Sequence, residues 1–359
     1  MKAWDAIVVG GGIIGLSLAL ELRKNGLSVL IVERGEPGRE ASHAAAGMLA
    51  YCDPHIPEPL RPLVRESARI YPEFVHEIED ESGMRADLRD AGTIALLADG
   101  TPPGGARELS EEDLMRLEPS VSADRAQLWE EKSVDPRALS AAALKAAKHR
   151  GVDISSGSPV LEIEIQDGHA AGVRTSKTSY AAGLVVNSAG AWSGALPPFQ
   201  FPTRPVKGQM LSVVSGQRNL LRHVVRAPKV YLVPRSDGRI LIGATVEDAG
   251  FDKRTNPETI QKLHQEAANI VPELGEARIL EDWAGLRPGT PDDLPVLGEM
   301  PARGYFAATG HFRDGILLAP VTAKVMGGTI TGAGCGLDLA AFSPARFFAD
   351  AEFRKLRTG

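Results

Sequence analysis

The sequence predicts a mixed fold, in which an α/β unit built on a parallel sheet is interrupted by an α+β unit built on an antiparallel sheet. Three observations predict it. A short apolar run at residues 6–9 is followed by a glycine-rich turn, a helical segment and a second apolar run, as in a βαβ unit. Between about residues 202 and 281 the pattern changes to alternating segments typical of antiparallel strands. Buried-strand patterns return at residues 184–186 and 305–309, so the α/β part encloses the inserted one.

Each element follows from a local pattern in chain order. Residues 6–9 are continuously apolar, as in a strand buried on both faces, and the helix that starts at Ile13 ends where Asn25 and Gly26 supply a stop signal. Ser110 precedes three acidic residues, which suits the first turn of a helix. The other predicted helices are 61–82, 136–150 and 315–331, and the other predicted strands are 28–32, 93–97, 160–165, 209–213, 230–233 and 239–242.

These elements predict two domains, which is the number that 359 residues would favour. We expect a Rossmann-like, discontinuous nucleotide-binding domain from residues 1–80, 140–200 and 284–359. The inserted domain, from residues 81–139 and 201–283, is expected to carry the antiparallel sheet and to bind the substrate. The Pro- and Gly-rich segment 98–106 is expected to be a surface loop.

Composition excludes several classes of protein. The chain is 43% hydrophobic and 24% charged with a net charge of -6, which is ordinary globular composition and argues against nucleic-acid binding. Cys52 and Cys335 are too few for a disulfide framework or a cysteine metal site, so we expect no metal and a reducing, cytoplasmic location. No window offers the roughly 18 apolar residues of a membrane span, and glycines interrupt the apolar N-terminal stretch, so we expect neither membrane attachment nor a signal peptide.

The first turn of the chain predicts a phosphate-binding site. Gly10, Gly12 and Gly15 occupy the three glycine positions of a G-x-G-x-x-G pattern between a strand and a helix. Glu33 ends the next strand, where a carboxylate binds ribose hydroxyls. The alternative is a glycine-rich turn without a ligand. The pattern does not separate NAD from FAD, but the small residues of 42–49 permit a flat ring to approach, unless they merely begin an alanine-rich helix.

Six stretches of the sequence resemble one known family in their order along the chain. They are VVGGGIIG at 8–15, SHAAAGML at 42–49, PVKGQMLSV at 205–213, YLVPRSDGRILIGAT at 231–245, WAGLRPGTPDDLPVLG at 283–298 and ATGHFRDGILLAP at 308–320. The chain thereby resembles the glycine oxidase and D-amino acid oxidase family of flavoproteins, which includes a bacterial enzyme of thiamine biosynthesis.

This resemblance implies noncovalently bound FAD and oxidative deamination of glycine or small D-amino acids, with sarcosine also open. It implies O2 as the electron acceptor and H2O2 as a product. The implied mechanism is hydride transfer from the substrate Cα–H to flavin N5, which needs orientation more than an enzyme base, so no catalytic side chain is expected. The expected partners are a small amino acid and O2, and a homo-oligomer is left open.

The resemblance also assigns residues to the two ligands. For the substrate, Arg287 is expected to clamp the carboxylate with two parallel hydrogen bonds, Arg313 and Tyr231 to add further contacts, and Val246 to line the pocket. For the cofactor, the expected residues beyond the glycines are Ile13, Ile14, Glu33, Arg34, Ala41, Ser42, Ala46, Gly47, Met48, Val160, His311, Phe312, Arg313, Asp314, Gly315, Ile316 and Leu317.

Several of these residues have a plainer interpretation. Arg287 suits a surface position, as most arginines do, and Arg313 suits an ion pair with Asp314. His311 is interpreted as a residue with backbone contacts to the flavin rather than as a base. Trp192 and Trp283 suit packing, and the carboxylates at 292–293 suit a solvated turn.

The sequence departs from the family pattern at positions that bear on the substrate and the cofactor link. Val246 stands where the resemblance leads us to expect methionine and Lys229 where it leads us to expect histidine, so a preference for glycine is open. Related amine dehydrogenases attach FAD through a histidine, but here Ala44 takes that register and His43 lies one residue earlier. Cys335 is expected to be an ordinary thiol.

Two other functions compete with an oxidase. One is an FAD-dependent amine or D-amino acid dehydrogenase that passes electrons to a quinone or a partner protein. The other is a dinucleotide-binding sensor without catalysis, which motifs at both the cofactor and the substrate end disfavour.

Overall fold

The protein is described by a computed structural model that covers residues 3–96, 106–217, 219–334 and 336–348. The first part of the molecule contains a six-stranded sheet. Five of its strands run parallel, and the edge strand β18 pairs antiparallel with its neighbour. Across the sheet, the strands are β18 (Val296–Glu299), β19 (Tyr305–Thr309), β12 (Leu184–Asn187), β1 (Ala6–Val9), β2 (Val29–Val32) and β8 (Asp153–Ser155).

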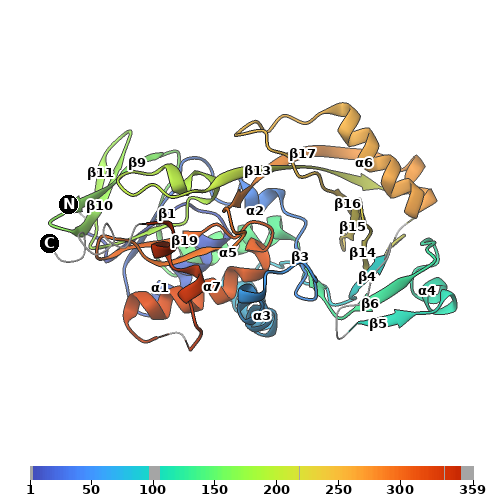
Figure 1. Ribbon diagram of the computed structural model, residues 1–359, viewed down its shortest axis with the longest axis horizontal. Helices are drawn as coiled ribbons and strands as arrows, with labels where there is room; N and C mark the ends of the chain where they lie inside the picture. The colour runs from blue at the N-terminus through green and yellow to red at the C-terminus, as the bar shows by residue number, and fades with distance from the viewer. Residues whose placement is uncertain (1–2, 97–105, 218, 335, 349–359) are drawn as a thin grey trace.

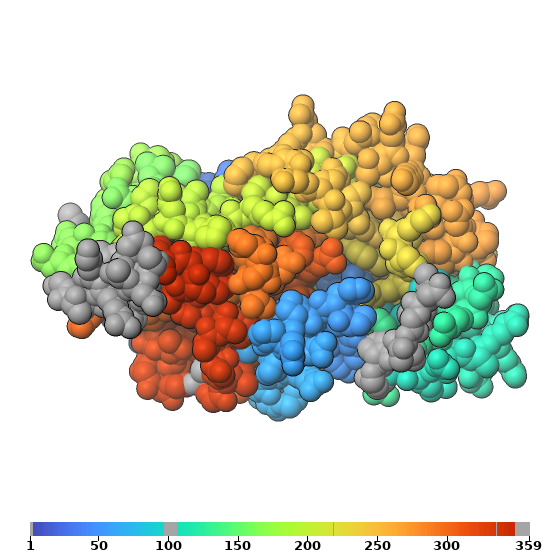
Figure 2. Space-filling model, viewed as in Figure 1, coloured from blue at the N-terminus to red at the C-terminus, as the bar shows by residue number. Residues whose placement is uncertain are grey.

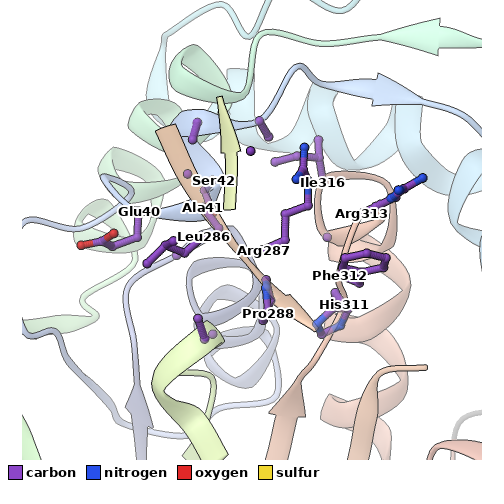
Figure 3. Close-up of a pocket in the computed structure, with 18 of the residues that line it drawn as sticks. Glu40, Ala41, Ser42, Leu286, Arg287, Pro288, His311, Phe312, Arg313 and Ile316 are labelled. Atoms are coloured by element: carbon purple, nitrogen blue, oxygen red, sulfur yellow. The ribbon is translucent and has the colours of Figure 1, made fainter. Parts of the chain in front are cut away.

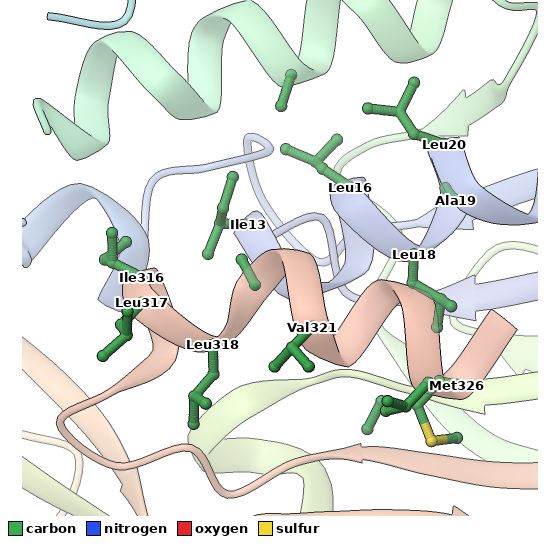
Figure 4. Close-up of a cluster of buried hydrophobic side chains, with 14 of the residues drawn as sticks. Ile13, Leu16, Leu18, Ala19, Leu20, Ile316, Leu317, Leu318, Val321 and Met326 are labelled. Atoms are coloured by element: carbon green, nitrogen blue, oxygen red, sulfur yellow. The ribbon is translucent and has the colours of Figure 1, made fainter. Parts of the chain in front are cut away.

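Helices cover one face of this sheet. Helix α1 (Ile13–Lys24) packs between α5 (Pro136–His149) and α7 (Gly315–Thr331), and α3 (Arg61–Ser82) packs against α5 and α7. The contact between α1 and α7 is a layer of fully apolar side chains (Figure 4). Burying one Leu or Ile side chain contributes about 1.5–3 kcal/mol, so this layer fixes both helix N-termini against the sheet.

A three-stranded antiparallel sheet covers the opposite face. Its strands are β9 (Val160–Gln166), β10 (His169–Thr175) and β11 (Ser179–Ala181). Ile163 and Val173 of this small sheet share a buried cluster with Ile7 and Leu30 of the parallel sheet. The parallel strands are therefore buried on both sides, as their continuous apolar sequences predict.

An eight-stranded, mostly antiparallel sheet forms the second part of the molecule. Its order is β17 (Arg278–Gly289), β13 (Arg204–Val214), β16 (Arg239–Gly243), β15 (Tyr231–Pro234), β14 (Val224–Arg226), β4 (Thr93–Leu96), β6 (Ala126–Trp129) and β5 (Arg107–Leu109). Helix α6 (Pro257–Ile270) packs on β13 and β16. The long strands β13 and β17 run from the helices α1, α5 and α7 to the end that carries α6 (Figure 1). They physically join the two parts.

Short elements complete the chain. Helix α4 (Glu111–Leu117) starts at Ser110, whose side chain accepts from the Asp113 N–H. On the surface shown in Figure 2, α3 lies beside the segment that contains α7. The remaining elements are α2 (Ala41–Ala44), the paired strands β3 (Met48–Leu49) and β7 (Lys132–Ser133), and the 3-10 helices η1 (Glu58–Leu60), η2 (Gly190–Ala195), η3 (Pro272–Glu276), η4 (Ala340–Phe342) and η5 (Pro344–Phe347).

The predicted elements lie within one or two residues of the observed ones except at β13, which begins at Arg204, five residues before the predicted strand 209–213. Two long elements were not predicted. Helix α6 interrupts the region interpreted as sheet, although Asn256 and Pro257 are a usual helix start and the Asn256 side chain accepts from two backbone N–H groups. Strand β17 was not predicted because apolar and polar residues do not alternate along it, and its two glycines and one proline are typical of turns. The predicted domain boundaries stay a prediction.

The expectations for the loop at 98–106, a membrane span and a metal site can be compared with the described residues only. Most of the predicted loop 98–106 and Cys335 lie outside the described residues. Within the residues that the structure describes, we find no helix long and apolar enough to cross a membrane. In the same residues no group of three or more His, Cys, Asp or Glu side chains is placed to hold a metal ion.

Candidate active site

A cavity of about 660 Å³ lies between the carboxyl edge of the parallel sheet and one face of the eight-stranded sheet. The ends of β1, β2, β12 and β19 supply one wall, because parallel strands leave their carboxyl ends on the same edge. Strands β13, β15, β16 and β17 supply the other wall. Figure 3 shows Arg287 in the middle of this lining, with Ala41 and Ser42 to one side and Arg313 to the other.

The glycine turn forms the first end of the cavity. Gly10 has a φ of 105°, which favours glycine, and a Cβ there would lie 2.5 Å from the Ser188 carbonyl oxygen. A Cβ on Gly15 would lie 2.0 Å from the Gly10 carbonyl oxygen, so Gly15 sets how closely α1 approaches the turn. The N–H of Ile13 donates to Ser42 Oγ at 2.9 Å. The turn therefore has the close packing that the three-glycine pattern predicts.

Glu33 and Arg34 lie next to this turn, at the end of β2. Glu33 is buried, with Oε2 accepting from the Gly11 N–H at 2.7 Å and Oε1 from the Gly35 N–H at 2.8 Å. Each carboxylate oxygen has a second lone pair, so these bonds leave acceptor capacity toward the cavity. The Arg34 guanidinium lies 4.2 Å from the centroid of the Trp192 ring. This corner can surround a nucleoside with a carboxylate, a cation and an aromatic ring.

The small residues predicted to approach a flat ring form the next part of the wall. Ala41–Ala44 is a one-turn helix, and the chain then becomes extended into β3. Gly47 has a φ of 76°, and a Cβ there would lie 2.0 Å from the Val134 carbonyl oxygen. A Cβ on Gly285 would lie 2.3 Å from that of Ala44. The run begins as a helix, as the alternative interpretation has it, and then lines the cavity with backbone; its approach to a flat ring stays a prediction.

The loop after β19 and the start of α7 face the same space. His311 is 3% exposed, and its Nε2 lies 2.9 Å from Thr322 Oγ1. Burial lowers the pKa of His311 to about 3, so the imidazole is neutral at ordinary pH. A buried, neutral ring that is hydrogen-bonded within the protein agrees with the interpretation that His311 is not a base, and its backbone contacts to a flavin stay a prediction.

Asp314 precedes α7 but does not cap it, because its side chain makes no hydrogen bond to the first turn. Burial raises the pKa of Asp314 to about 7, the Asp53 carboxylate adds to the rise, and Arg313 and Arg226 oppose it. Gly315 and Ile316 of the first turn line the cavity. The positive end of a buried helix thus points at the cavity, where it favours negative charge on a ligand.

Arg287 projects from β17 across Gly208 of β13. Its Nη1 donates to the Thr245 carbonyl at 3.1 Å and to the Lys207 carbonyl at 3.4 Å. A Cβ on Gly208 would lie 2.4 Å from both Nη atoms, so only glycine leaves room for the guanidinium. Two backbone carbonyls hold Nη1, which leaves the other donors of the fork, close to the Tyr231 hydroxyl, for a carboxylate. Arg287 is therefore not a surface arginine.

Tyr231 lies on β15 over Gly243, where a Cβ would lie 2.8 Å from the tyrosine hydroxyl. Burial raises the pKa of Tyr231, and the charges of Arg287 and Arg313 oppose the rise. The hydroxyl stays protonated at ordinary pH and lies within reach of the Arg287 guanidinium. It can donate to a carboxylate that Arg287 binds.

Arg313 is exposed, and its guanidinium lies over the Phe312 ring, 5.2 Å from the ring centroid, rather than against Asp314. Phe312 has a φ of 45°, which is unusual for a bulky residue, and its N–H donates to the Pro288 carbonyl at 3.0 Å. This bond ties the loop of Arg313 to the end of β17. The structure thus brings Arg287 and Arg313 to one cavity, and the ion pair between Arg313 and Asp314, which was the alternative interpretation of Arg313, is not made.

Val246 and Lys229 are at the open side of the cavity. Val246 is 55% exposed and lines it, and exposed Lys229 makes an ion pair with Glu266 at 3.0 Å. Asp292 and Asp293, by contrast, are outside the lining, where Asp292 pairs with Arg346 at 2.8 Å. The interpretation of these two carboxylates as part of a turn agrees with this position.

All but two of the predicted site residues line the cavity. Gly15 lies behind the turn, as its packing role requires. Leu317 is 1% exposed and points into the core between helices, while its carbonyl accepts from Ser67 Oγ. Helical periodicity explains this, because Ile316 and Leu317 are about 100° apart around α7 and only one can face the cavity. The roles of the lining residues stay predictions.

The two tryptophans differ. Trp192 lines the cavity and stacks on Phe251 with ring centroids 5.2 Å apart, whereas Trp283 lies outside the lining and donates to the Ala44 carbonyl at 3.1 Å. His43 also lies outside the lining, and its carbonyl accepts from Arg137. This position offers no support for a covalent cofactor link through His43.

Three lining residues that sequence reasoning missed are Asp53, Met210 and Arg226. Met210 pairs with Gly243 and Arg226 with Tyr231 across the sheet. Only the strand register places them beside the predicted substrate contacts, and no local pattern signals it.

Comparisons with known proteins agree with this geometry. A model of the family described as FAD dependent oxidoreductase matches residues 5–340. The chain is 36% identical over 356 residues to the bifunctional protein ThiO/ThiG of Synechocystis, covering 96% of this chain but 54% of the relative. It is 35% identical to the glycine oxidase of Bacillus licheniformis, covering 92% and 94% of the two chains. This chain therefore spans about half the length of the bifunctional relative.

The fold gives the same result. The crystal structure of glycine oxidase from Geobacillus kaustophilus superposes with a TM-score of 0.91 at 32% identity, covering 97% of this chain and 100% of that one. The predicted fold class, a Rossmann-like part interrupted by an antiparallel-sheet part, is thereby confirmed.

Proposed function

Because this chain belongs to the family of FAD-dependent oxidoreductases, we propose that it oxidatively deaminates glycine or small neutral D-amino acids, with sarcosine as a further candidate, and passes the electrons to O2. In the overall reaction, amino acid, O2 and water give the 2-oxo acid, ammonia (or methylamine from sarcosine) and H2O2. The two electrons come from the substrate Cα–H bond as the amine is oxidised to an imine, and together with two protons they reduce one O2 to H2O2, while water hydrolyses the imine.

FAD is the cofactor of this family, and the residues present fit it. A dinucleotide needs a pyrophosphate turn without side chains, a hydrogen-bonding group for the ribose and a wall of small residues for the ring. Gly10 and Gly12 provide the first, Glu33 the second, and the backbone around Gly47 the third. When bound, FAD supplies the two-electron acceptor for the amine.

The observation that carries the proposal is the position of Arg287. Its guanidinium lies in the same cavity as the glycine turn and is held by two backbone carbonyls over Gly208. A cation presented this way selects a carboxylate and fixes its direction. We therefore assign Arg287 as the clamp for the substrate carboxylate.

Tyr231 and Arg313 help to orient the substrate by placing polar groups at its carboxylate end. Tyr231 donates its hydroxyl hydrogen to the carboxylate, and Arg313 adds positive charge at the same end. His311 has a low pKa and is hydrogen-bonded to Thr322, so its imidazole is a poor base and has no role as one in this proposal. Holding the reacting atoms in place can lower a reaction barrier by up to roughly 7–11 kcal/mol, so orientation of the substrate accounts for much of the rate without a base.

The exposed valine at the rim bears on substrate size. Val246 ends in two methyl groups at the open side of the cavity, so a small side chain on a D-amino acid has room there. The charge of Lys229 is engaged by Glu266 and adds little to substrate binding. We therefore expect D-alanine to be accepted along with glycine.

One experiment tests cofactor and substrate class together. The purified protein is loaded with FAD and mixed anaerobically with glycine, sarcosine, D-alanine and L-alanine. We expect the visible absorbance of the oxidised flavin to be lost with the first three amines. A protein that retains FAD but is bleached by no amine would refute the proposed function.

A second measurement tests the electron acceptor. With air admitted, we expect one H2O2 for each amine consumed. If turnover requires a quinone analogue or an artificial dye and no H2O2 forms, the protein is a dehydrogenase of the same family.

A further inference from the structure

A third arginine, Arg226, lines the cavity beside the proposed substrate contacts. It is the last residue of β14 and lies directly opposite Tyr231 of β15 in the antiparallel register. Residues directly opposite each other project from the same face of a sheet, with Cβ atoms about 4.5–5.5 Å apart. The charges of Arg226 and Arg287 both act on the Tyr231 hydroxyl. Arg226 is therefore a neighbour of the proposed clamp on the substrate side.

Its partner is a carboxylate that also lines the cavity. Arg226 Nη2 makes an ion pair with Asp53, which lies in the loop after β3, and the guanidinium lies 5.2 Å from the centroid of the Trp129 ring. Nη1 is buried and makes no hydrogen bond within the described residues. A guanidinium has five N–H donors in a fixed fork, so Asp53 satisfies only part of it. Arg226 has unused capacity to bind an anion.

Asp53 is ionised in this position. Burial raises its pKa, but the Arg226 charge and hydrogen bonds from His55 outweigh burial, and the net effect is a lowered pKa. Asp53 thus lines the cavity beside the guanidinium that it pairs with, and that guanidinium keeps a donor without a partner among the described residues. A second carboxylate on a substrate that approached Arg226 would also approach Asp53, and like charges at short range repel.

The two arginines therefore differ in what they offer. Arg287 is held by neutral carbonyls and keeps its full positive charge, whereas the charge of Arg226 is compensated by Asp53. An amino acid with one carboxylate is bound at Arg287, and near Arg226 it meets an ion pair rather than an unpaired cation. A dicarboxylic amino acid gains nothing at Arg226 and is repelled by Asp53.

We propose that Asp53 is a specificity-determining residue, which masks Arg226 and so restricts the cavity to amino acids with a single carboxylate. This inference rests on the proposed function for the identity of the substrate end. Without the charge at position 53, Arg226 becomes a second anion-binding group and the cavity accepts dicarboxylic amines such as iminodiacetate or D-aspartate.

The test uses FAD-loaded protein and two inert ligands, propionate and succinate, followed by the change that each causes in the flavin absorbance. In Asp53→Asn the side chain still accepts from Arg226 but has no charge. We expect the affinity for succinate to rise about tenfold or more while that for propionate changes less than twofold. Added salt should reduce the gain, since it depends on charge.

Three variants separate this explanation from others. Asp53→Asn combined with Arg226→Met should lose the gain for succinate, and Asp53→Glu should show none. Glu77→Gln on α3 is the matched control, because it removes one negative charge from an exposed ion pair with Lys24 of α1. If Asp53→Asn does not retain FAD, Asp53→Ser supplies the same neutral position.

Two results would overturn the inference. One is unchanged succinate affinity in a neutral variant that retains FAD, and the other is a gain that persists without Arg226. Activity adds a further readout, because the ratio of kcat/KM for D-aspartate to that for glycine should rise with the affinity. If the wild type oxidises no amine, the proposed function fails while the titrations still report on Asp53 and Arg226.

Discussion

The two ends of the cavity are built in different ways. The proposed cofactor end is built mainly from backbone, glycines and small side chains of two short stretches, residues 10–15 and 41–48, with Glu33 and Arg34 beside them, and the Glu33 carboxylate binds backbone N–H groups. The substrate end consists of long charged and aromatic side chains from strands that are far apart in the sequence, such as Tyr231 and Arg287. Space for a ligand is made by the absence of Cβ atoms at one end and by convergence of side chains at the other.

This difference predicts how each end fails when it is changed. At the cofactor end an added methyl group has nowhere to go, because the opposing atom is a backbone oxygen of a packed turn. At the substrate end a side chain can be shortened without a clash, so the fold and the cofactor persist while binding is lost. The following predictions test that difference, beginning with the largest expected effect.

Gly15→Ala should abolish FAD binding and unfold the nucleotide-binding part. The new Cβ would lie 2.0 Å from the Gly10 carbonyl oxygen, and no side chain can yield there. We expect more than about 4 kcal/mol of destabilisation, which exceeds what most single substitutions cost. Flavin content after purification and thermal unfolding measure it.

The matched control is Gly216→Ala, at a glycine with no atom within 4 Å of the new Cβ. It should leave flavin content and the unfolding temperature unchanged. Equal behaviour of the two variants would contradict the assignment of Gly15 as a contact that packing requires.

Arg287→Ala should lower kcat/KM for glycine about 1000-fold, roughly 4 kcal/mol of transition-state stabilisation, and leave FAD bound. The reason is loss of two charge-assisted hydrogen bonds that also orient the substrate. Arg287→Lys keeps the charge but not the fork, so we expect a loss of about 100-fold. Steady-state kinetics and the flavin spectrum separate the two effects, and a colourless Arg287→Ala protein would show that the arginine supports the cofactor instead.

The low pKa of His311 predicts a pH dependence of the stability of the folded protein. Its pKa in the folded protein is about 3, against about 6.5 in the unfolded chain. Between these values the unfolded chain binds a proton that the folded protein does not, so stability falls as the pH falls. One such group contributes a slope of at most about 1.4 kcal/mol per pH unit.

His311→Gln removes this slope. The stability advantage of the wild type over the variant should therefore shrink by about 1 kcal/mol per pH unit between pH 6 and 4. Urea unfolding of the two proteins at several pH values measures the difference. An advantage that does not change with pH would show that the imidazole is not held neutral.

Tyr231→Phe should have the smallest effect, a loss of about tenfold in kcat/KM or about 1.4 kcal/mol, because one neutral donor to the carboxylate is removed. The ring remains over Gly243, so flavin content and stability should not change. A loss as large as that of Arg287→Ala would mean that the hydroxyl holds Arg287 in place rather than contacting the substrate alone.

The sequence alone predicted much of the fold because its strands and helices have strong local patterns. The strand at residues 6–9, the helix after Gly12 and the helix at 315–331 lie as predicted. Helix α6 was missed although Asn256 and Pro257 signal its start, and β17 was missed because its residues do not alternate. The substrate residues were reached through family resemblance, since no local pattern marks an arginine as a ligand-binding one.

The sequence by itself determined the glycine turn of the proposed cofactor end, because consecutive residues set the conformation of a turn between a strand and a helix. The tertiary structure decided the substrate end. Arg226 is paired with Tyr231 by strand register and with Asp53 by the folding of a distant loop over the sheet. Contacts of that kind depend on which strands become neighbours, and that choice is made by packing of the whole core rather than by any local run of residues.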